Sequence, residues 1–304
     1  MSDLTQPPTG TGPVVVGFDG STSGEDALAL ARWLSRVGEV PTIVVVVHPS
    51  PAAISPARVD AEWVADRHRL AERLLGEARD ILALGEPEGP VEYRIVASSS
   101  PAHGLHDVAE EAGASVIVAG SRAEGPEERL FAGSTADRLL SGSMCPVAVA
   151  PSGMRNRKPG ALTRIGVAYV ETPEAAAMLD VAAQVALRTS ATLRLYTVVA
   201  EEAEVMPLLI GRDAERAFLS TAREAYQDAL DRALAGLPTS IQATGHLLTG
   251  NVVEVLAELD GNDIDVLFCG SRGYGPVRRV LLGGVSWRLV RSARSPVVVV
   301  PRGD

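Results

Sequence analysis

Residues 116–135 read VIVAGSRAEGPEERLFAGST, and residues 266–285 read VLFCGSRGYGPVRRVLLGGV. In both stretches a short apolar run is followed by Gly-Ser-Arg, and a further glycine stands thirteen positions after the first one. The two copies are 150 residues apart, and the same spacing separates Pro146 from Pro296. Matched landmarks at so long a period indicate a duplicated domain.

The sequence around these loops predicts strands alternating with helices in both copies. In the first copy, strands are expected at 14–19, 43–47, 91–96, 115–119 and 147–150, with helices following Ser21–Ser23 and at 60–84, 102–112 and 134–140. In the second copy, strands are expected at 165–168, 193–199, 241–244, 266–269 and 297–300, with helices at 173–188, 213–234, 252–259 and 285–292. Near-continuous Val/Ile strands between helices predict an α/β fold with two tandem, doubly wound, five-stranded parallel sheets. Ligands of such sheets bind beyond the carboxyl ends of the strands, where the strand order reverses.

The length of 304 residues fits two domains. We expect a disordered tail at 1–11, a first domain at 12–151, a linker at 152–162 and a second domain at 163–304. The polar N-terminal stretch has no apolar core typical of a secretion signal, and Cys145 and Cys269 stand in apolar surroundings without a CxxC pair. These features favour a cytoplasmic location with reduced thiols.

Composition excludes several classes of chemistry. The net charge of −10 opposes binding to nucleic acid or to anionic membranes, so neither is expected as a partner. Lys158 is the only lysine, which leaves no lysine for a Walker P-loop, a Schiff base or pyridoxal attachment. His103 and His106 stand three residues apart, but no third ligand converges on them, so no metal site is predicted.

The glycine loops suit a phosphate chain. Gly120 leaves its strand without a Cβ, and Gly133-Ser134-Thr135 begins a helix with two hydroxyl groups, so backbone amides and a helix N-terminus can approach an anion. Asp19, at the end of the first strand, has the chemistry to bind a ribose hydroxyl or a ring amine. The alternative reading is that these glycines only form tight turns and that Ser134 only caps its helix.

Together, the Gly-x2-Gly-x9-Gly-Ser/Thr pattern, the opening Val-Gly-Phe-Asp-Gly-Ser and the closing Cys-Pro-Val-Ala-Val and Ser-Pro-Val-Val-Val resemble the universal stress protein family in its tandem form. The resemblance covers both copies. It implies the strand order 3-2-1-4-5 and, in the ATP-binding branch, a nucleotide held by Asp19, the glycine loop and the backbone of Val46 and Val47. It also implies pairing of the final strands, 147–150 with 297–300, within one chain or between two chains of a homodimer.

Neither copy matches the family pattern fully. In the first copy Ala123 replaces the second glycine, and Glu124, Glu127 and Glu128 add negative charge to the loop. In the second copy Ala168 is taken to stand where Asp19 stood, and Gly284 replaces the hydroxyl residue, although Arg272, Arg278 and Arg279 favour phosphate. The expected nucleotide-binding residues are Asp19, Gly20, Ser21, Val46, Val47, Gly120, Arg122, Ala123, Gly133, Ser134 and Thr135 in the first copy, and Gly270, Arg272, Gly273, Gly283, Gly284 and Val285 in the second.

Taken with the glycine loops, the resemblance therefore implies a regulatory module that binds adenine nucleotide, most simply ATP with or without Mg²⁺, in a stress response. If only one copy binds, the first is favoured because Asp19 and Ser134 supply directional hydrogen bonds. No catalytic residues are assigned, and any enzymatic activity is expected to be at most weak ATP hydrolysis. The alternatives are a slow ATP hydrolase and a nucleotide-free interaction scaffold. The expected partners are the nucleotide, a second copy of the domain and an unknown signalling protein.

Overall fold

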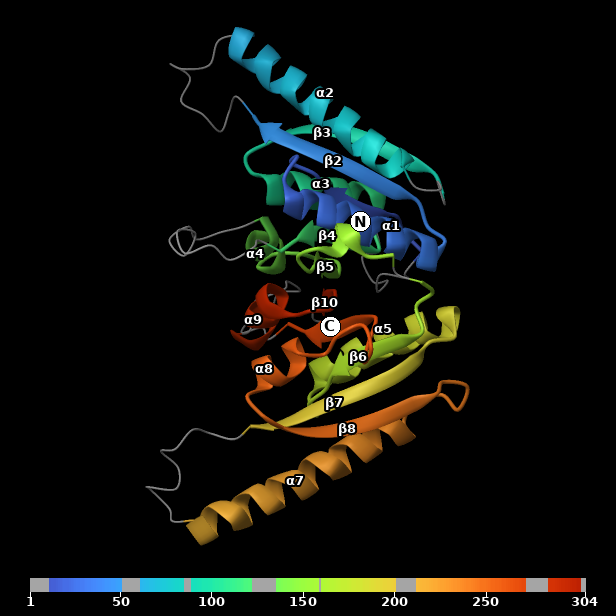
Figure 1. Cartoon of the computed structure of the whole chain (residues 1–304), viewed down its shortest axis with the longest axis vertical. Helices are drawn as coiled ribbons and strands as arrows, with labels where there is room; N and C mark the ends of the chain where they lie inside the picture. Colours follow the sequence, from blue (N-terminus) through green and yellow to red (C-terminus); the bar gives the residue numbers. More distant parts are fainter. Residues whose placement is uncertain are drawn as a thin grey trace, which may run out of the picture.

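A single ten-stranded sheet runs through the molecule (Figure 1). The computed structural model describes residues 11–50, 61–84, 89–121, 135–158, 160–200, 212–271 and 284–301. The strands are β1 (Val14–Gly17), β2 (Thr42–Pro49), β3 (Val91–Ser98), β4 (Val116–Gly120), β5 (Val147–Ala150), β6 (Arg164–Ala168), β7 (Thr192–Ala200), β8 (Ala243–Gly250), β9 (Val266–Gly270) and β10 (Val297–Val300). The α-helices are α1 (Thr22–Gly38), α2 (Ala61–Ala83), α3 (Pro101–Ala112), α4 (Thr135–Leu140), α5 (Pro173–Thr189), α7 (Arg212–Ala235), α8 (Val252–Ala257) and α9 (Gly284–Ser292).

The strand order is β3-β2-β1-β4-β5-β10-β9-β6-β7-β8. Each half therefore has the predicted order 3-2-1-4-5, and the strands within each half pair in parallel. At the centre, β5 and β10 pair antiparallel, with Val149 opposite Val297 and Val147 opposite Val299. Of the two pairings that the sequence left open, the one within a single chain is observed.

Helices cover both faces of the sheet because successive strand residues point to opposite sides. On one face, Val14 and Val16 of β1 belong to an apolar core that includes Leu30 of α1 and Met178 of α5. On the other face, Val15 packs in a core formed with α3 and α4. The first of these cores contains residues of both halves, so the halves share a core as well as a sheet.

The third strand of the second half was predicted at 241–244, and this prediction was wrong. β8 spans Ala243–Gly250 and pairs with β7 along its whole length, from Leu193 opposite Ala243 to Ala200 opposite Gly250. β8 is an edge strand, and its small and polar residues Thr244, Gly245 and His246 hide the expected apolar pattern. His246 lies within β8, and its ring stacks on that of Tyr196 with 5.0 Å between the ring centroids.

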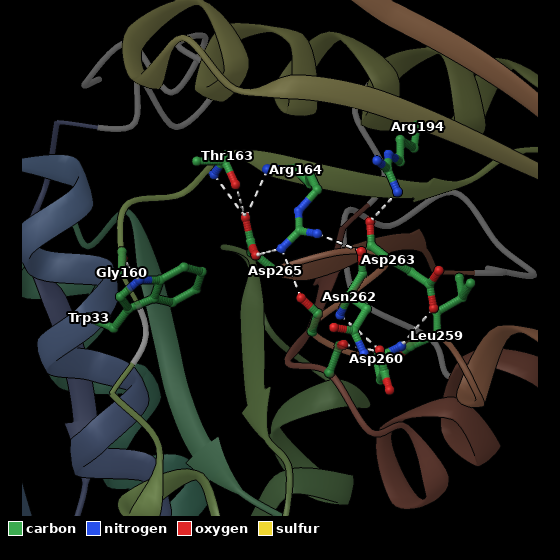
Figure 2. Close-up of polar contacts among 12 residues, drawn as sticks. Trp33, Gly160, Thr163, Arg164, Arg194, Leu259, Asp260, Asn262, Asp263 and Asp265 are labelled. Atoms are coloured by element: carbon green, nitrogen blue, oxygen red, sulfur yellow. Dashed lines mark hydrogen bonds and ion pairs between the residues drawn. The ribbon is translucent and has the colours of Figure 1, made fainter.

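The segment between the halves, predicted as a linker, packs against α1 where the structure describes it. Met154 is buried, and the Asp26 carboxylate accepts hydrogen bonds from the backbone N–H groups of Gly153 (3.0 Å) and Arg155 (2.8 Å). Farther along, the indole N–H of Trp33 donates to the Gly160 carbonyl at 2.8 Å (Figure 2). These contacts fix the path of the chain from the first half into the second.

Candidate functional site

The loop after β1 forms a polar cluster at the N-terminus of α1. Oδ1 of Asp19 accepts hydrogen bonds from the backbone N–H of Ser21 (3.0 Å) and from its hydroxyl (2.5 Å). Oγ of Ser21 accepts in turn from the N–H of Gly24 at 3.1 Å, which confirms the predicted cap. Because Asp19 is exposed, its fixed carboxylate faces solvent at the carboxyl edge of the sheet.

The end of β2 lies beside this cluster. β1 pairs with β2 as far as Gly17 opposite Val45, and the Phe18 N–H donates to the Val45 carbonyl at 3.0 Å. Alternate residues of a strand turn their backbone groups toward the same neighbour, so the N–H and C=O of Val47 face the side on which β1 has ended. Val46 turns its own groups toward β3, where it lies opposite Ile95. We call residues 18–21, 46–47 and 120 the first rim.

Gly120 has a structural role at the first rim. A Cβ built on it would lie 1.9 Å from the Ser23 carbonyl oxygen, so the first turn of α1 fits only against a glycine. Gly20 is required for a different reason, since its φ is +76°. The tight-turn interpretation is therefore not met at Gly120, which ends strand β4 and is required by a close backbone approach.

The second half was aligned incorrectly in the prediction that Ala168 replaces Asp19. Val14 of β1 and Ile165 of β6 occupy matching places beside Val116 and Val266, and the helix caps Ser21 and Thr172 show the same 151-residue offset. Val170 therefore replaces Asp19, and Ala168 corresponds to Gly17. The early part of the repeat is offset by one residue more than the glycine loops, which sequence comparison of the loops alone does not reveal. The position of Asp19 therefore has no carboxylate in the second half, and the carboxylate of the neighbouring Glu171 is paired with Arg232.

The corresponding edge of the second half differs in other ways; we call residues 169–172, 197–198 and 270–271 the second rim. The Thr197 hydroxyl, at the place of Val46, donates to the Tyr169 carbonyl at 2.9 Å. No described atom lies within 4 Å of a Cβ built on Gly270. Oγ of Ser271 is buried, with no hydrogen-bond partner among the described residues. Among the described residues, the second rim thus leaves more space at its glycine, and it has Val170 in place of Asp19.

The helix that follows each glycine loop begins close to its prediction. Thr135 is the first residue of α4, and Gly284 and Val285 are the first two residues of α9. The hydroxyl of Ser286 in α9 donates to the Gly270 carbonyl at 2.9 Å, which brings the start of that helix to the end of β9. The structure thus brings Gly270, Gly284 and Val285 to one edge of the sheet.

Comparison with known proteins identifies the fold and the repeat together. The Universal stress protein family matches residues 11–151 and again residues 162–301. The chain belongs to the universal stress protein family. Universal stress proteins of Mycobacterium bovis and Mycobacterium tuberculosis are each 32% identical to it over 293 residues, which cover 95% of this chain and 99% of each relative.

Solved structures share the whole tandem fold. A universal stress protein from Archaeoglobus fulgidus superposes with a TM-score of 0.65 at 22% identity and covers 98% of this chain and 99% of its own. A functionally unknown protein from Pseudomonas aeruginosa superposes with a TM-score of 0.61 at 15% identity, covering 96% of this chain and 93% of its own. At these identities the likeness shows the fold alone.

Several expected ligand-binding positions of this universal stress protein lie outside the described residues. They are Arg122, Ala123, Gly133, Ser134, Arg272, Gly273 and Gly283, together with the acidic and basic residues of the two loops. The structure therefore brings together the first-strand, second-strand and Gly120 parts of the first rim. The phosphate end of either rim stays a prediction from sequence.

Sequence reasoning missed Gly24. A Cβ on this buried residue would lie 2.8 Å from Oδ1 of Asp19. Because glycine has no Cβ, the Asp19 carboxylate has room at this position. By the 151-residue offset, the second half has Ala175 at this position, where Val170 brings no carboxylate that needs the space. A glycine in the first turn of a helix, where it lowers helix propensity, was the available signal.

The two cysteines and His103 were also singled out in the sequence. Burial raises the pKa of Cys145 to about 11 and that of Cys269 to about 12, so both thiols stay protonated at neutral pH. His103 contacts Asp107 at 3.8 Å, and no group of three or more His, Cys, Asp or Glu side chains in the described ranges is placed to hold a metal ion. Across the same ranges, every helix is too short or too polar to span a membrane.

Proposed function

We propose that this tandem universal stress protein binds ATP at the first rim and acts as a regulatory module. Membership of the family supports a stress-related role. The observation that carries the nucleotide proposal is the fixed Asp19 carboxylate beside the outward backbone groups of Val47. These are the positions to which the family resemblance assigns the adenosine.

The chemistry of the first rim suits a nucleoside. Ser21 donates to Oδ1 of Asp19, which leaves Oδ2 without a hydrogen bond from any described residue and available to accept from a ribose hydroxyl. The N–H and C=O of Val47 form a donor–acceptor pair that matches one edge of adenine. Because Ser21 holds the carboxylate and Gly24 leaves space for it, the rim is pre-organised, which lowers the entropy cost of binding.

The second rim is proposed as a structural partner. The side chain of Val170 cannot accept a hydrogen bond, and the Thr197 hydroxyl already donates to the Tyr169 carbonyl. The arginines of its loop favour phosphate, but the one carboxylate of this rim, Glu171, is held by the Arg232 guanidinium at 3.0 and 2.8 Å and is therefore less available to a ribose. The second half therefore supports the first through the shared sheet and core.

The test is isothermal titration of ATP into the full chain and two variants. Asp19→Ala should weaken ATP binding at least tenfold, because removal of a directional hydrogen-bonding charge costs about 1.5–3 kcal/mol. Val170→Ala, at the equivalent position of the second half, should leave the dissociation constant within about twofold. Equal affinity of Asp19→Ala and the unaltered chain would disprove the proposal, as would failure of the unaltered chain to bind any of ATP, ADP, AMP and cyclic AMP.

The proposal includes no dedicated catalytic step. A bound nucleotide exposed at a rim permits at most slow hydrolysis by a positioned water. Phosphate release measured with Asp19→Ala as the background would detect it. We propose that ATP bound at the first rim alters the surface that a signalling protein contacts.

A further inference from the structure

A cavity that no residue of either rim lines lies between the two halves. It has a volume of about 400 Å³ and is walled by α1 on one side and α5 on the other. Its floor is formed by apolar residues of the shared sheet, among them Val14, Phe268 and Val298. Both helices lie to the right of the centre in Figure 1, one above and one below the junction of the halves.

The lining is mostly apolar. Leu34 and Val37 of α1 face Val181 and Val185 of α5, and Leu162, from the segment that joins the halves, is also part of the wall. Ligand sites are typically apolar clefts of about 300–1,000 Å³, and they occur preferentially between domains. Apolar cavities exclude water and accept apolar guests instead. The site therefore has the size and the lining of a small-molecule pocket.

The mouth of the cavity determines the charge of its ligand. α1 ends at Gly38 and α5 at Thr189, and both residues line the cavity, so the negative ends of two helix dipoles lie beside it. Glu39 adds a carboxylate, and Arg188 balances it from the opposite helix. Two helix C-termini also present carbonyl groups that accept hydrogen bonds. This setting disfavours anions and suits an uncharged molecule with a hydrogen-bond donor.

We propose that the cavity between α1 and α5 binds an uncharged, largely apolar small molecule, such as a ring compound that carries one hydrogen-bond donor. Because α1 belongs to the first half and α5 to the second, such a ligand contacts both halves at once. Binding to the folded state alone would raise the thermal stability of the chain. This proposal does not depend on nucleotide binding, since no residue of either rim lines the cavity.

The experiment uses N-phenyl-1-naphthylamine, a neutral ring amine whose fluorescence rises in apolar surroundings. We expect saturable binding with a dissociation constant on the order of tens of micromolar, unaffected by ATP. 1-Anilinonaphthalene-8-sulfonate has the same ring framework with an added sulfonate, and it should bind at least tenfold more weakly. Equal or tighter binding of the sulfonate would overturn the assigned ligand class.

Three tryptophan substitutions on α5 locate the site. Gln184 is exposed and lines the cavity, so Gln184→Trp should close the mouth without disturbing the fold, and Val185→Trp should fill the interior. Both should weaken binding of the neutral amine at least tenfold. Leu187, 48% exposed and outside the lining, supplies the matched control Leu187→Trp, which should bind like the unaltered chain. Unchanged binding by Gln184→Trp would overturn the proposal even if Val185→Trp failed to fold.

Discussion

At the scale of single residues, the two glycines that end β4 and β9 occupy matching positions but have different surroundings. A Cβ on Gly120 would meet the Ser23 carbonyl oxygen at 1.9 Å, whereas no described atom lies within 4 Å of one on Gly270. The glycine of this motif is therefore required for packing in the first half. In the second half, the described residues leave space for a side chain at the same position. A substitution that adds one methyl group distinguishes these roles.

We predict that Gly120→Ala lowers the free energy of unfolding by about 2–3 kcal/mol, because α1 must shift to admit the Cβ. Gly270→Ala should change it by less than about 0.5 kcal/mol. Urea denaturation of the two variants measures both values. Equal effects at the two positions would show that the first turn of α1 does not approach β4 as closely as described.

Asp26 is the buried charge on which the path between the halves depends. Its side chain is 3% exposed, and the Arg155 guanidinium contacts both of its carboxylate oxygens at 3.0 Å, in addition to the two backbone donors. Because Arg155 is one-third exposed, the pair is only partly screened by solvent. Such a carboxylate cannot be removed without leaving several donors unpaired.

We predict that Asp26→Ala lowers the free energy of unfolding by about 3 kcal/mol, the typical result of removing one partner of a buried ion pair. The matched control is Asp66→Ala on α2, where an exposed ion pair with Arg69 should contribute less than about 1 kcal/mol. Chemical denaturation at neutral pH compares the two. If Asp26→Ala lowers the free energy of unfolding no more than the control does, the contacts of Asp26 with Gly153 and Arg155 do not stabilise the fold as predicted.

At the scale of elements, Asp265 connects the start of β9 to the start of β6. Oδ2 of Asp265 accepts hydrogen bonds from the backbone N–H groups of Thr163 and Arg164 and from the Thr163 hydroxyl, all at 2.8 Å (Figure 2). The Arg164 guanidinium donates to Oδ1 at 3.0 Å. Burial alone raises the pKa of Asp265, but these hydrogen bonds outweigh it and hold the pKa below its ordinary value.

A lowered carboxyl pKa has a defined effect on stability. The contribution of Asp265 to the free energy of unfolding is fully present above the ordinary aspartate pKa of about 3.9. It is lost as the pH falls through the lowered pKa that Asp265 has in the folded chain. Asp265→Asn should therefore be less stable than the unaltered chain from pH 5 to pH 7, and the difference should shrink below about pH 4. Urea denaturation across this range measures it, with Asp180→Asn, on the exposed surface of α5, as the control. A difference that does not vary with pH contradicts the assignment.

At the scale of the whole molecule, the duplication and the alternation of strands and helices were readable from sequence because they depend on local patterns. The strand order and the pairing of the final strands came from the family resemblance. β8 was misplaced because, as an edge strand with small and polar residues, it shows little apolar periodicity. The hydrogen bonds of Asp26 to Gly153 and Arg155 could not be predicted, since their partners are separated by 127 and 129 positions in the sequence.

The candidate site was predictable only in part. Asp19 and Ser21 follow from the motif and from strand-end placement, Val47 was implied by the family resemblance, and the structure brings all three to one edge of the sheet. The partner of Asp19 in the second half was misassigned because the 150-residue spacing of the glycine loops does not extend to β6. The packing role of Gly120 depends on the approach of α1, which no local pattern encodes.

We propose that this duplicated chain has one nucleotide site, at the first rim, which contains Asp19. Native mass spectrometry of the full chain in the presence of saturating ATP counts bound nucleotides directly. We expect one ATP per unaltered chain and, at an ATP concentration just sufficient to saturate it, a clearly lower occupied fraction for Asp19→Ala. Two nucleotides per unaltered chain, or equal occupancy of Asp19→Ala, would contradict this proposal.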